Sequence, residues 1–154
     1  MSAFDPNLFL NQTVEQANSE ARLLVPEDEY QGIILPDKVQ VSKVDWAEGT
    51  FYKLNLQVEI IDPMGKVKAA THRDKNIVRY DVNLDLNEAG NGLDMREGMN
   101  VGLGRLRAAL GQNVPNRPWS MSMLGGQVIA FKLKHKLDKE GQPREQITDV
   151  KKPG

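Results

Sequence analysis

FYKLNLQVEI, residues Phe51 to Ile60, is the stretch that decides the fold, because apolar and polar side chains alternate along its whole length. Successive side chains of a β-strand point to opposite faces, so this alternation predicts a strand with one apolar and one polar face. The even positions hold Tyr52, Leu54, Leu56, Val58 and Ile60. The odd positions begin with Phe51, Lys53, Asn55 and Gln57. We expect the even face to join a buried core and the odd face to meet solvent or a ligand.

One further strand is predicted before this stretch and one after it. One runs from Tyr30 to Val41, where apolar residues fall on odd positions and Pro36 places a bend in the middle. The other lies within Lys66 to Leu86. The turn sequence DPMG, Asp62 to Gly65, predicts that the chain folds back between the two through a hairpin, with the polar segment after it as a projecting end or loop.

One helix and two strands complete the predicted elements. Three leucines recur at helical spacing, Leu103, Leu106 and Leu110, and Gly111 stands where a helix commonly ends. The stretch Val128 to Leu137 alternates again and predicts a fourth strand, whose apolar face continues through His135 and Leu137. A weaker fifth strand is predicted around Ile147 and Val150.

The order of three strands, one helix and two strands is that of the OB-fold, a small, partly open Greek-key barrel. We therefore predict a mainly β protein with an N-terminal arm or short helix over residues 1–29 and a five-stranded OB-fold-like barrel over residues 30–152. Other small barrels and open α+β sheets share this order. We favour the barrel because the second, third and fourth strands each have one apolar and one polar face.

The chain has 154 residues, a formal net charge of −1 and no cysteine. This length suits one domain with its own core, and the lack of cysteine excludes disulfide frameworks and thiolate metal sites and fits a reducing cytosol. The sequence has no basic segment followed by a long apolar run, and no run of about 18 apolar residues. We therefore expect a soluble protein that is neither secreted nor inserted in a membrane.

The near-zero net charge conceals an uneven distribution of charge. Residues 1–31 carry six acids and one arginine, whereas residues 128–154 carry seven basic residues and four acids. Such segregation allows one face to be basic although the whole chain is almost neutral. The total charge argues against a very basic, histone-like protein.

The sequence lacks the motifs of catalytic and cofactor sites. GLGRL, Gly102 to Leu106, lacks the third glycine of a dinucleotide-binding loop, and Ser120 and Ser122 lack the setting of a nucleophile. The two histidines, His72 and His135, are far apart and have no cysteine beside them, which argues against a metal site. We therefore expect neither an enzyme nor a cofactor nor a bound metal.

The odd face of the stretch from Phe51 to Gln57 combines an aromatic ring, a cation and amides. Single-stranded nucleic acid is bound by such groups, because rings stack on bases, cations pair with phosphates and amides reach base edges. Phe51 and Lys53 are therefore candidate binding residues. Trp46 and Trp119 lie in predicted loops, where each is either docked on the barrel or exposed as a further stacking surface. An ordinary solvated face is the alternative reading.

Two groups of cations favour the nucleic-acid interpretation. The first group lies in the predicted projecting segment and comprises Lys66, Lys68, Arg73, Lys75 and Arg79. The second occupies one face of the fourth strand and comprises Lys132, Lys134 and Lys136, about 6.6 Å apart, close to the spacing of successive phosphates on an extended strand. For each group the alternative is solubility or protection of an exposed sheet edge.

Segments spread over nearly the whole chain carry a family resemblance: FLNQTVEQAN (9–18), EDEYQGII (27–34), GLGRLRAALGQN (102–113), WSMSMLGGQVIAFKLKHK (119–136) and ITDVKKP (147–153). Together they resemble a group of bacteriophage-encoded proteins similar to single-stranded DNA-binding proteins. The resemblance implies an OB-fold protein that coats single strands in phage DNA replication or recombination, in the host cell cytoplasm. It also implies phage replication or recombination proteins as partners.

The chain departs from such proteins at its end. Bacterial and several phage single-strand binders end in an acidic tail that recruits partners, whereas this sequence ends VKKPG and gathers acids at Glu27, Asp28 and Glu29. The expected function is non-enzymatic, sequence-tolerant binding of single-stranded DNA. A homo-oligomer is compatible with this function. The alternative is a small-barrel structural or adaptor protein of the phage particle, in which the acidic arm ties neighbouring subunits together.

Overall fold

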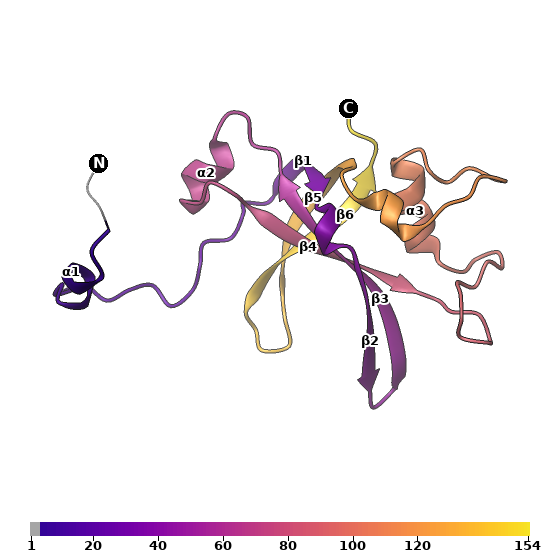
Figure 1. Ribbon diagram of the computed structural model, residues 1–154, viewed down its shortest axis with the longest axis horizontal. Helices are drawn as coiled ribbons and strands as arrows, with labels where there is room; N and C mark the ends of the chain where they lie inside the picture. The colour runs from indigo at the N-terminus through magenta and orange to yellow at the C-terminus, as the bar shows by residue number, and fades with distance from the viewer. Residues whose placement is uncertain (1–3) are drawn as a thin grey trace.

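The structure is a computed structural model that describes residues 4–154. Within them, six strands form one antiparallel sheet: β1 Asp28–Ile34, β2 Gln40–Trp46, β3 Gly49–Ile60, β4 Ile77–Leu84, β5 Val128–Leu137 and β6 Pro143–Lys151. The helices are short: α1 Pro6–Leu10, α2 Lys66–Thr71 and α3 Val101–Ala109, with single 3-10 turns at Pro36–Lys38 and Met121–Leu124. The protein is therefore mainly β, as predicted (Figure 1).

β3 is the central strand of the sheet. Its residues Tyr52 to Glu59 pair with β4 along one edge. Along the other edge, Gly49 to Asn55 pair with β2 and Val58 to Ile60 pair with β1. β1 also pairs with β5, and β5 pairs with β6, so the sheet curls back toward β4.

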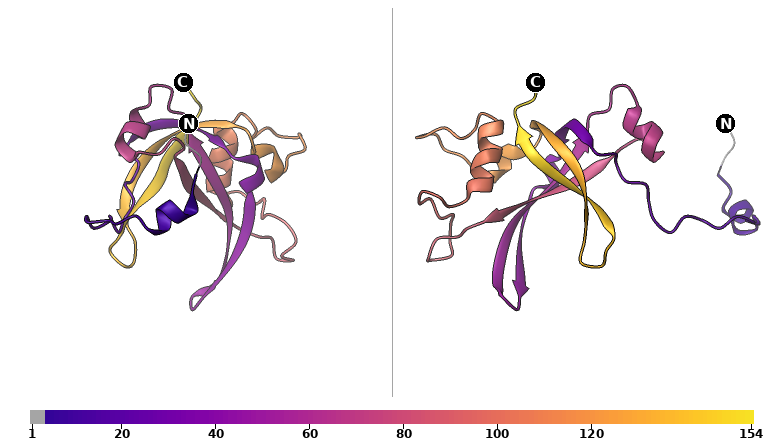
Figure 2. Two further views of the ribbon diagram at one scale, coloured as in Figure 1. Left: turned by 60° about the vertical axis from the view of Figure 1, so that its left-hand side comes forward. Right: turned by 180° about the vertical axis from the view of Figure 1, so that it is seen from behind.

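The sheet is open between β4 and β6, so the predicted OB-fold-like barrel is not confirmed. Among the described residues these two strands contact each other but share no ladder of hydrogen bonds. Helix α3 contacts both of them and covers the opening at one end (Figures 1 and 2).

Two predicted elements differ from the structure. The first predicted strand is two strands, β1 and β2, because Pro36 starts a 3-10 turn between them. The turn predicted at Asp62 to Gly65 is present, since the Gly65 N–H donates to the Asp62 carbonyl oxygen at 3.2 Å, and the chain folds back from β3 to β4. The segment after it, predicted as a projecting hairpin end or loop, begins instead with helix α2. The Asp62 carboxylate accepts the backbone N–H groups of Val67 and Lys68 at 3.2 and 3.0 Å, which satisfies donors that the first turn of a helix leaves free. These two N–H groups, with the bond to Lys68 the stronger, lower the pKa of Asp62.

Helix α3 confirms the prediction from its leucine spacing. Leu103 and Leu106 are buried, and Gly111 follows the helix with φ 69°, a left-handed conformation that glycine adopts without strain. Asn100 directly precedes the helix. Its side-chain oxygen accepts the Asp85 N–H at 2.7 Å, and its backbone N–H donates to the Asp85 carboxylate at 2.8 Å. This reciprocal pair ties α3 to the end of β4.

The core is built from the even face of β3 and the odd positions of β5. From β3 it takes Leu54, Leu56, Val58 and Ile60, as the alternation predicted. From β5 it takes Ile129, Phe131 and Leu133, all at most 1% exposed. The predicted continuation of this face through His135 and Leu137 is wrong, because β5 extends beyond β1 there and both residues are exposed.

The first part of the N-terminal arm, residues 4–19, extends away from the sheet, and α1 lies far from α3 (Figures 1 and 2). The arm is fixed to the body at Val25, which is fully buried. The Val25 N–H donates to Glu145 at 2.6 Å, and the Val25 carbonyl oxygen accepts the ring N–H of His135 at 2.6 Å. No helix within residues 4–154 is long and apolar enough to cross a membrane.

Gly32 allows β1 to approach the core closely. A Cβ at this position would collide with Val58 and would lie 3.2 Å from the Phe131 ring and 3.0 Å from the Glu59 carbonyl oxygen. Only a residue without a side chain therefore fits between β3 and β5 at this point.

We predict that Gly32→Ala lowers the free energy of unfolding by about 1–3 kcal/mol, the usual cost of overpacking a core. Urea unfolding measures the change. The matched control is Gly104→Ala on α3, where the nearest atom to an added Cβ is 4.0 Å away and alanine is the better helix former. Equal stability of Gly32→Ala and the wild type would contradict the close approach.

Candidate nucleic-acid interface

The odd side chains of β3 form an outer face together with side chains of β2 and β4. The register places Ser42 and Asn83 beside Lys53, and Asp81 beside Asn55. The Asn55 side-chain amide donates to the Asp81 carboxylate at 2.7 Å. This face is polar and partly exposed, as the alternation predicted, and its aromatic residue is Phe51.

Four side chains cluster at the end of this face where the β2–β3 hairpin turns. The rings of Trp46 and Phe51 are 5.6 Å apart and tilted by 53°. Two ammonium groups lie near the Trp46 ring, Lys53 at 5.6 Å and Lys139 at 4.8 Å from its centre. Trp46 is 50% exposed and Phe51 is 41% exposed. We call Trp46, Phe51, Lys53 and Lys139 the Trp46 cluster.

Lys139 reaches the Trp46 cluster from a different hairpin, the one between β5 and β6. Both hairpins extend from the same side of the body (Figures 1 and 2). Asp138 holds the β5–β6 loop in shape, since its carboxylate accepts the N–H groups of Glu140 and Gln142, each at 2.9 Å, and the Arg144 guanidinium at 2.8 Å. Arg144 and these N–H groups lower the pKa of Asp138.

The Trp46 cluster offers two kinds of interaction to a ligand. The exposed rings provide apolar faces on which planar groups stack, and the two ammonium groups attract anions and already hold the Trp46 ring by cation–π contacts. Because the rings come from one hairpin and a cation comes from another, a ligand bound here touches both.

The lysines of β5 do not all have the same surroundings. Lys132 is flanked by carboxylates, Glu29 at 3.9 Å and Asp149 at 3.8 Å, which offset its charge. Lys134 and Lys136 are exposed and lie beyond Leu133, the last β5 residue that pairs with β1. Up to Leu133 the strand is paired on both sides, so protection of a sheet edge does not explain Lys132.

The basic segment from Lys66 to Arg79 is divided between two elements. Its first lysines belong to α2, which follows the opposite end of β3 from the Trp46 cluster, roughly 36 Å along the strand. Lys75 is exposed in the connection between α2 and β4. Arg79 lies on the outer face opposite Gln57 and 3.7 Å from the Asp81 carboxylate. The structure therefore brings Arg79, but not α2, to the face that carries Phe51.

Two cations of this segment have partners of their own. The Lys68 ammonium lies 2.8 Å from the Asp74 carboxylate, and this contact raises the pKa of Lys68 and lowers that of Asp74. The Arg73 Nε donates to Asn76 at 3.2 Å, and Arg73 is half-buried. Arg73 therefore shapes the connection to β4.

Trp119 is docked rather than presented to solvent. Its indole N–H donates to the Gln112 side chain at 2.9 Å, and the Arg107 guanidinium lies 4.2 Å from the ring centre. The ring packs against the core and lies outside the Trp46 cluster.

Sequence reasoning missed Lys139 and Asp138. Both stand in the segment DKEGQP, residues 138–143, which connects the last two predicted strands and carries no binding motif. A lysine at the tip of a hairpin was the available signal, but its approach to Trp46 depends on the pairing of distant strands. Among residues 4–154 no three histidine, aspartate or glutamate side chains gather into a group that could hold a metal ion. No protein-family model and no curated protein sequence matches the chain.

We predict that Asp138→Ala loosens the β5–β6 loop and separates Lys139 from Trp46. The amides of Glu140 and Gln142 should then exchange with solvent several-fold faster, as measured by hydrogen exchange, and Trp46 fluorescence should change. Glu140→Ala is the control, because it removes an acid from the same loop while keeping the Asp138 bonds. Unchanged exchange in Asp138→Ala would contradict the role of Asp138.

We also expect the loop to respond to pH in a defined direction. A carboxylate whose pKa is lowered by folding stabilises the loop above its unfolded pKa of about 3.9, and this stabilisation is lost as the pH falls through the lower folded value. NMR chemical shifts of the Glu140 and Gln142 amides should therefore titrate with a midpoint below about 3.9. A midpoint above that value would contradict the hydrogen bonds to Asp138.

Proposed function

We propose that the protein binds single-stranded DNA without sequence preference and without catalysing a reaction. The observation that carries the proposal is the Trp46 cluster, in which two exposed rings and two ammonium groups meet at the tips of two hairpins. Bases of any sequence have a π-face that stacks on such rings, and phosphates pair with such cations. Stacking contributes about 1–3 kcal/mol per base.

The topology supports an OB-fold-like assignment. When β1 and β2 are counted as one strand bent at Pro36, the chain has five strands with α3 between the third and the fourth. The Trp46 cluster then lies where the loop between the first two strands meets the loop between the last two. OB-folds bind oligonucleotides with the second and third strands and with these two loops.

The charged residues suggest a path for the strand beyond the Trp46 cluster. In the proposed complex, Arg79 and the amides of β3 meet the strand on the outer face, and Lys134 and Lys136 continue the path along β5. Five other cations contribute less to binding, because each is paired, half-buried or distant from the Trp46 cluster. They are Lys66, Lys68, Arg73, Lys75 and Lys132. Asn55 is bonded to Asp81, which limits its use in reading base edges and fits tolerance of sequence.

The family resemblance supplies the biological setting of this proposal. It points to coating of single strands during phage DNA replication or recombination in the host cytoplasm. The partners would then be the other proteins of that process.

A structural or adaptor role in the phage particle is the second candidate. The exposed apolar side chains of the arm, among them Phe9 and Leu10, favour it, because such chains commonly bind neighbouring subunits. Mass spectrometry of purified particles distinguishes the two roles, since a stoichiometric amount in particles supports the adaptor and absence supports replication.

We predict that oligo-dT quenches Trp46 fluorescence and that the affinity falls steeply with salt, because bound phosphates displace counterions. Trp46→Ala should weaken binding by about 5- to 150-fold, the equivalent of one lost stacking contact. The double variant Lys53→Gln with Lys139→Gln should reduce the slope of log affinity against log salt by about 1.4. Fluorescence anisotropy of labelled oligo-dT at two salt concentrations measures both effects.

The matched comparison replaces Lys66 and Lys68 by glutamine, which removes the same charge from α2. This variant should retain most of the affinity. Absence of binding at low salt, or an affinity indifferent to salt, would contradict the proposed function. Equal losses of affinity in the two double variants would mean that Lys53 and Lys139 act only through general electrostatic attraction.

A further inference from the structure

The N-terminal arm carries apolar side chains that the body does not cover. Phe4 is 72% exposed, Leu8 72%, Phe9 65% and Leu10 80%. Asp5 caps α1 by accepting the Asn7 N–H at 3.0 Å, and the rings of Phe4 and Phe9 are 5.1 Å apart. The arm thus presents a small, preformed apolar knob, which we define as Phe4, Leu8, Phe9 and Leu10.

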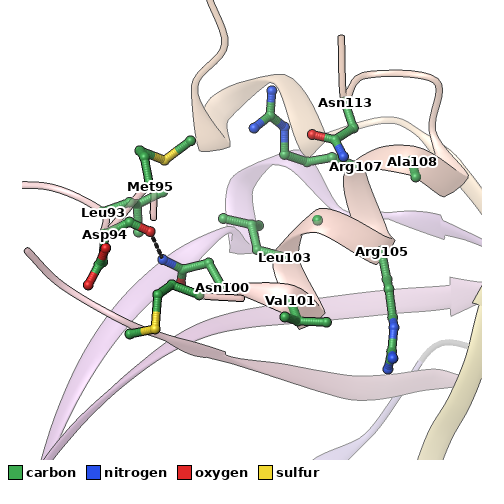
Figure 3. A pocket seen from close by; sticks show the side chains of 12 residues that line it. Leu93, Asp94, Met95, Asn100, Val101, Leu103, Arg105, Arg107, Ala108 and Asn113 are labelled. Carbon is green, nitrogen blue, oxygen red and sulfur yellow. Dashed lines mark hydrogen bonds between the residues drawn. The ribbon is translucent and has the colours of Figure 1, made fainter. Parts of the chain in front are cut away.

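A pocket at the other end of the molecule has matching properties. It has a volume of about 460 Å³ and lies beside α3 (Figure 3). Its apolar lining includes Leu93, Met95, Val101 and Leu103, of which Met95 is 75% and Val101 48% exposed. Methionine side chains are flexible and adapt to varied apolar partners. We call this hollow the α3 pocket.

The charges of the two surfaces are complementary. Residues 4–24 contain three acids, Asp5, Glu15 and Glu20, against the single Arg22. Helix α3 contains two arginines, Arg105 and Arg107, and no acid, and both arginines line the pocket. The one acidic residue of the lining, Asp94, is paired with Arg96 at 2.6 Å. Opposite charges steer two surfaces together and fix their orientation.

The positions of the knob and the pocket favour contact between two copies of the chain. The arm is fixed to the body at Arg22, 3.8 Å from Glu145, and at Val25. The eleven residues from Asn11 to Ala21 that separate α1 from this anchor span at most about 40 Å. Since α1 and α3 lie at opposite ends of the molecule, a neighbour placed head to tail presents its pocket to the knob without a strained tether (Figure 1).

We propose that the knob of one copy docks in the α3 pocket of a second copy. The two surfaces differ, so the contact is heterologous and each copy keeps one free knob and one free pocket. Repetition produces a ring or an open chain of subunits. This self-association does not depend on nucleic acid or on the proposed function.

Analytical ultracentrifugation of the full chain without nucleic acid tests the proposal. The average mass should rise above the monomer value of 17.2 kDa as the protein concentration increases. The arm variant, with Phe4→Ser and Phe9→Ser, should remain a monomer, because both positions are exposed and the body keeps its core. The pocket variant Ala108→Glu should also remain a monomer, since an acid then faces the acidic arm. Met64→Ser, which removes an 84% exposed apolar side chain elsewhere, should assemble like the wild type.

Mixing the two monomeric variants provides the sharpest result. The pocket variant has an intact knob and the arm variant has an intact pocket, so the mixture should form a dimer of twice the monomer mass and nothing larger. A wild type that remains a monomer at all concentrations would overturn the proposal, and so would self-association that persists in Ala108→Glu. Failure of the mixture to form the dimer would also overturn it.

Discussion

The pairing of β3 is the constraint on which the rest of the structure depends. One edge of this strand holds β4, and the other holds β2 and β1 in succession. Its even face supplies the centre of the core, so its odd face has to point outward. A slip of one residue would bury Lys53 and expose Leu54, which makes the register costly to change. The outer position of Phe51 and Lys53 is therefore a consequence of core formation.

Much of the fold could be predicted from local periodicity, and the exceptions have physical causes. In β3, β5 and α3 the apolar residues recur at a clear period, because each element packs one face against the core. Helix α2 is only six residues long, and the Asp62 carboxylate binds the N–H groups of its first turn. The sequence DPMG indicates the turn at this point but not the helix that follows it. Whether β4 and β6 pair to close the sheet depends on contacts between distant segments, which periodicity does not report, and the sheet stays open between them.

The candidate site was predictable to the extent that it lies on one strand. Phe51 and Lys53 follow from the alternation of β3, whereas Lys139 reaches Trp46 only through the position of the β5–β6 hairpin. The surroundings of Lys132 could not be predicted for the same reason, because they also depend on which strands pair. Its row of lysines looked uniform in sequence, but the pairing of β5 brings Glu29 from β1 and Asp149 from β6 to Lys132 alone.

The burial of Val25 has a consequence for how the chain tolerates proteolysis. The backbone before Arg22 is exposed and runs outside the body, so it is accessible to a protease. A cut there would release α1 and leave the core complete. A cut after Val25 would remove a fully buried side chain and its bonds to Glu145 and His135. The smallest stable fragment should therefore begin several residues before β1, near Arg22.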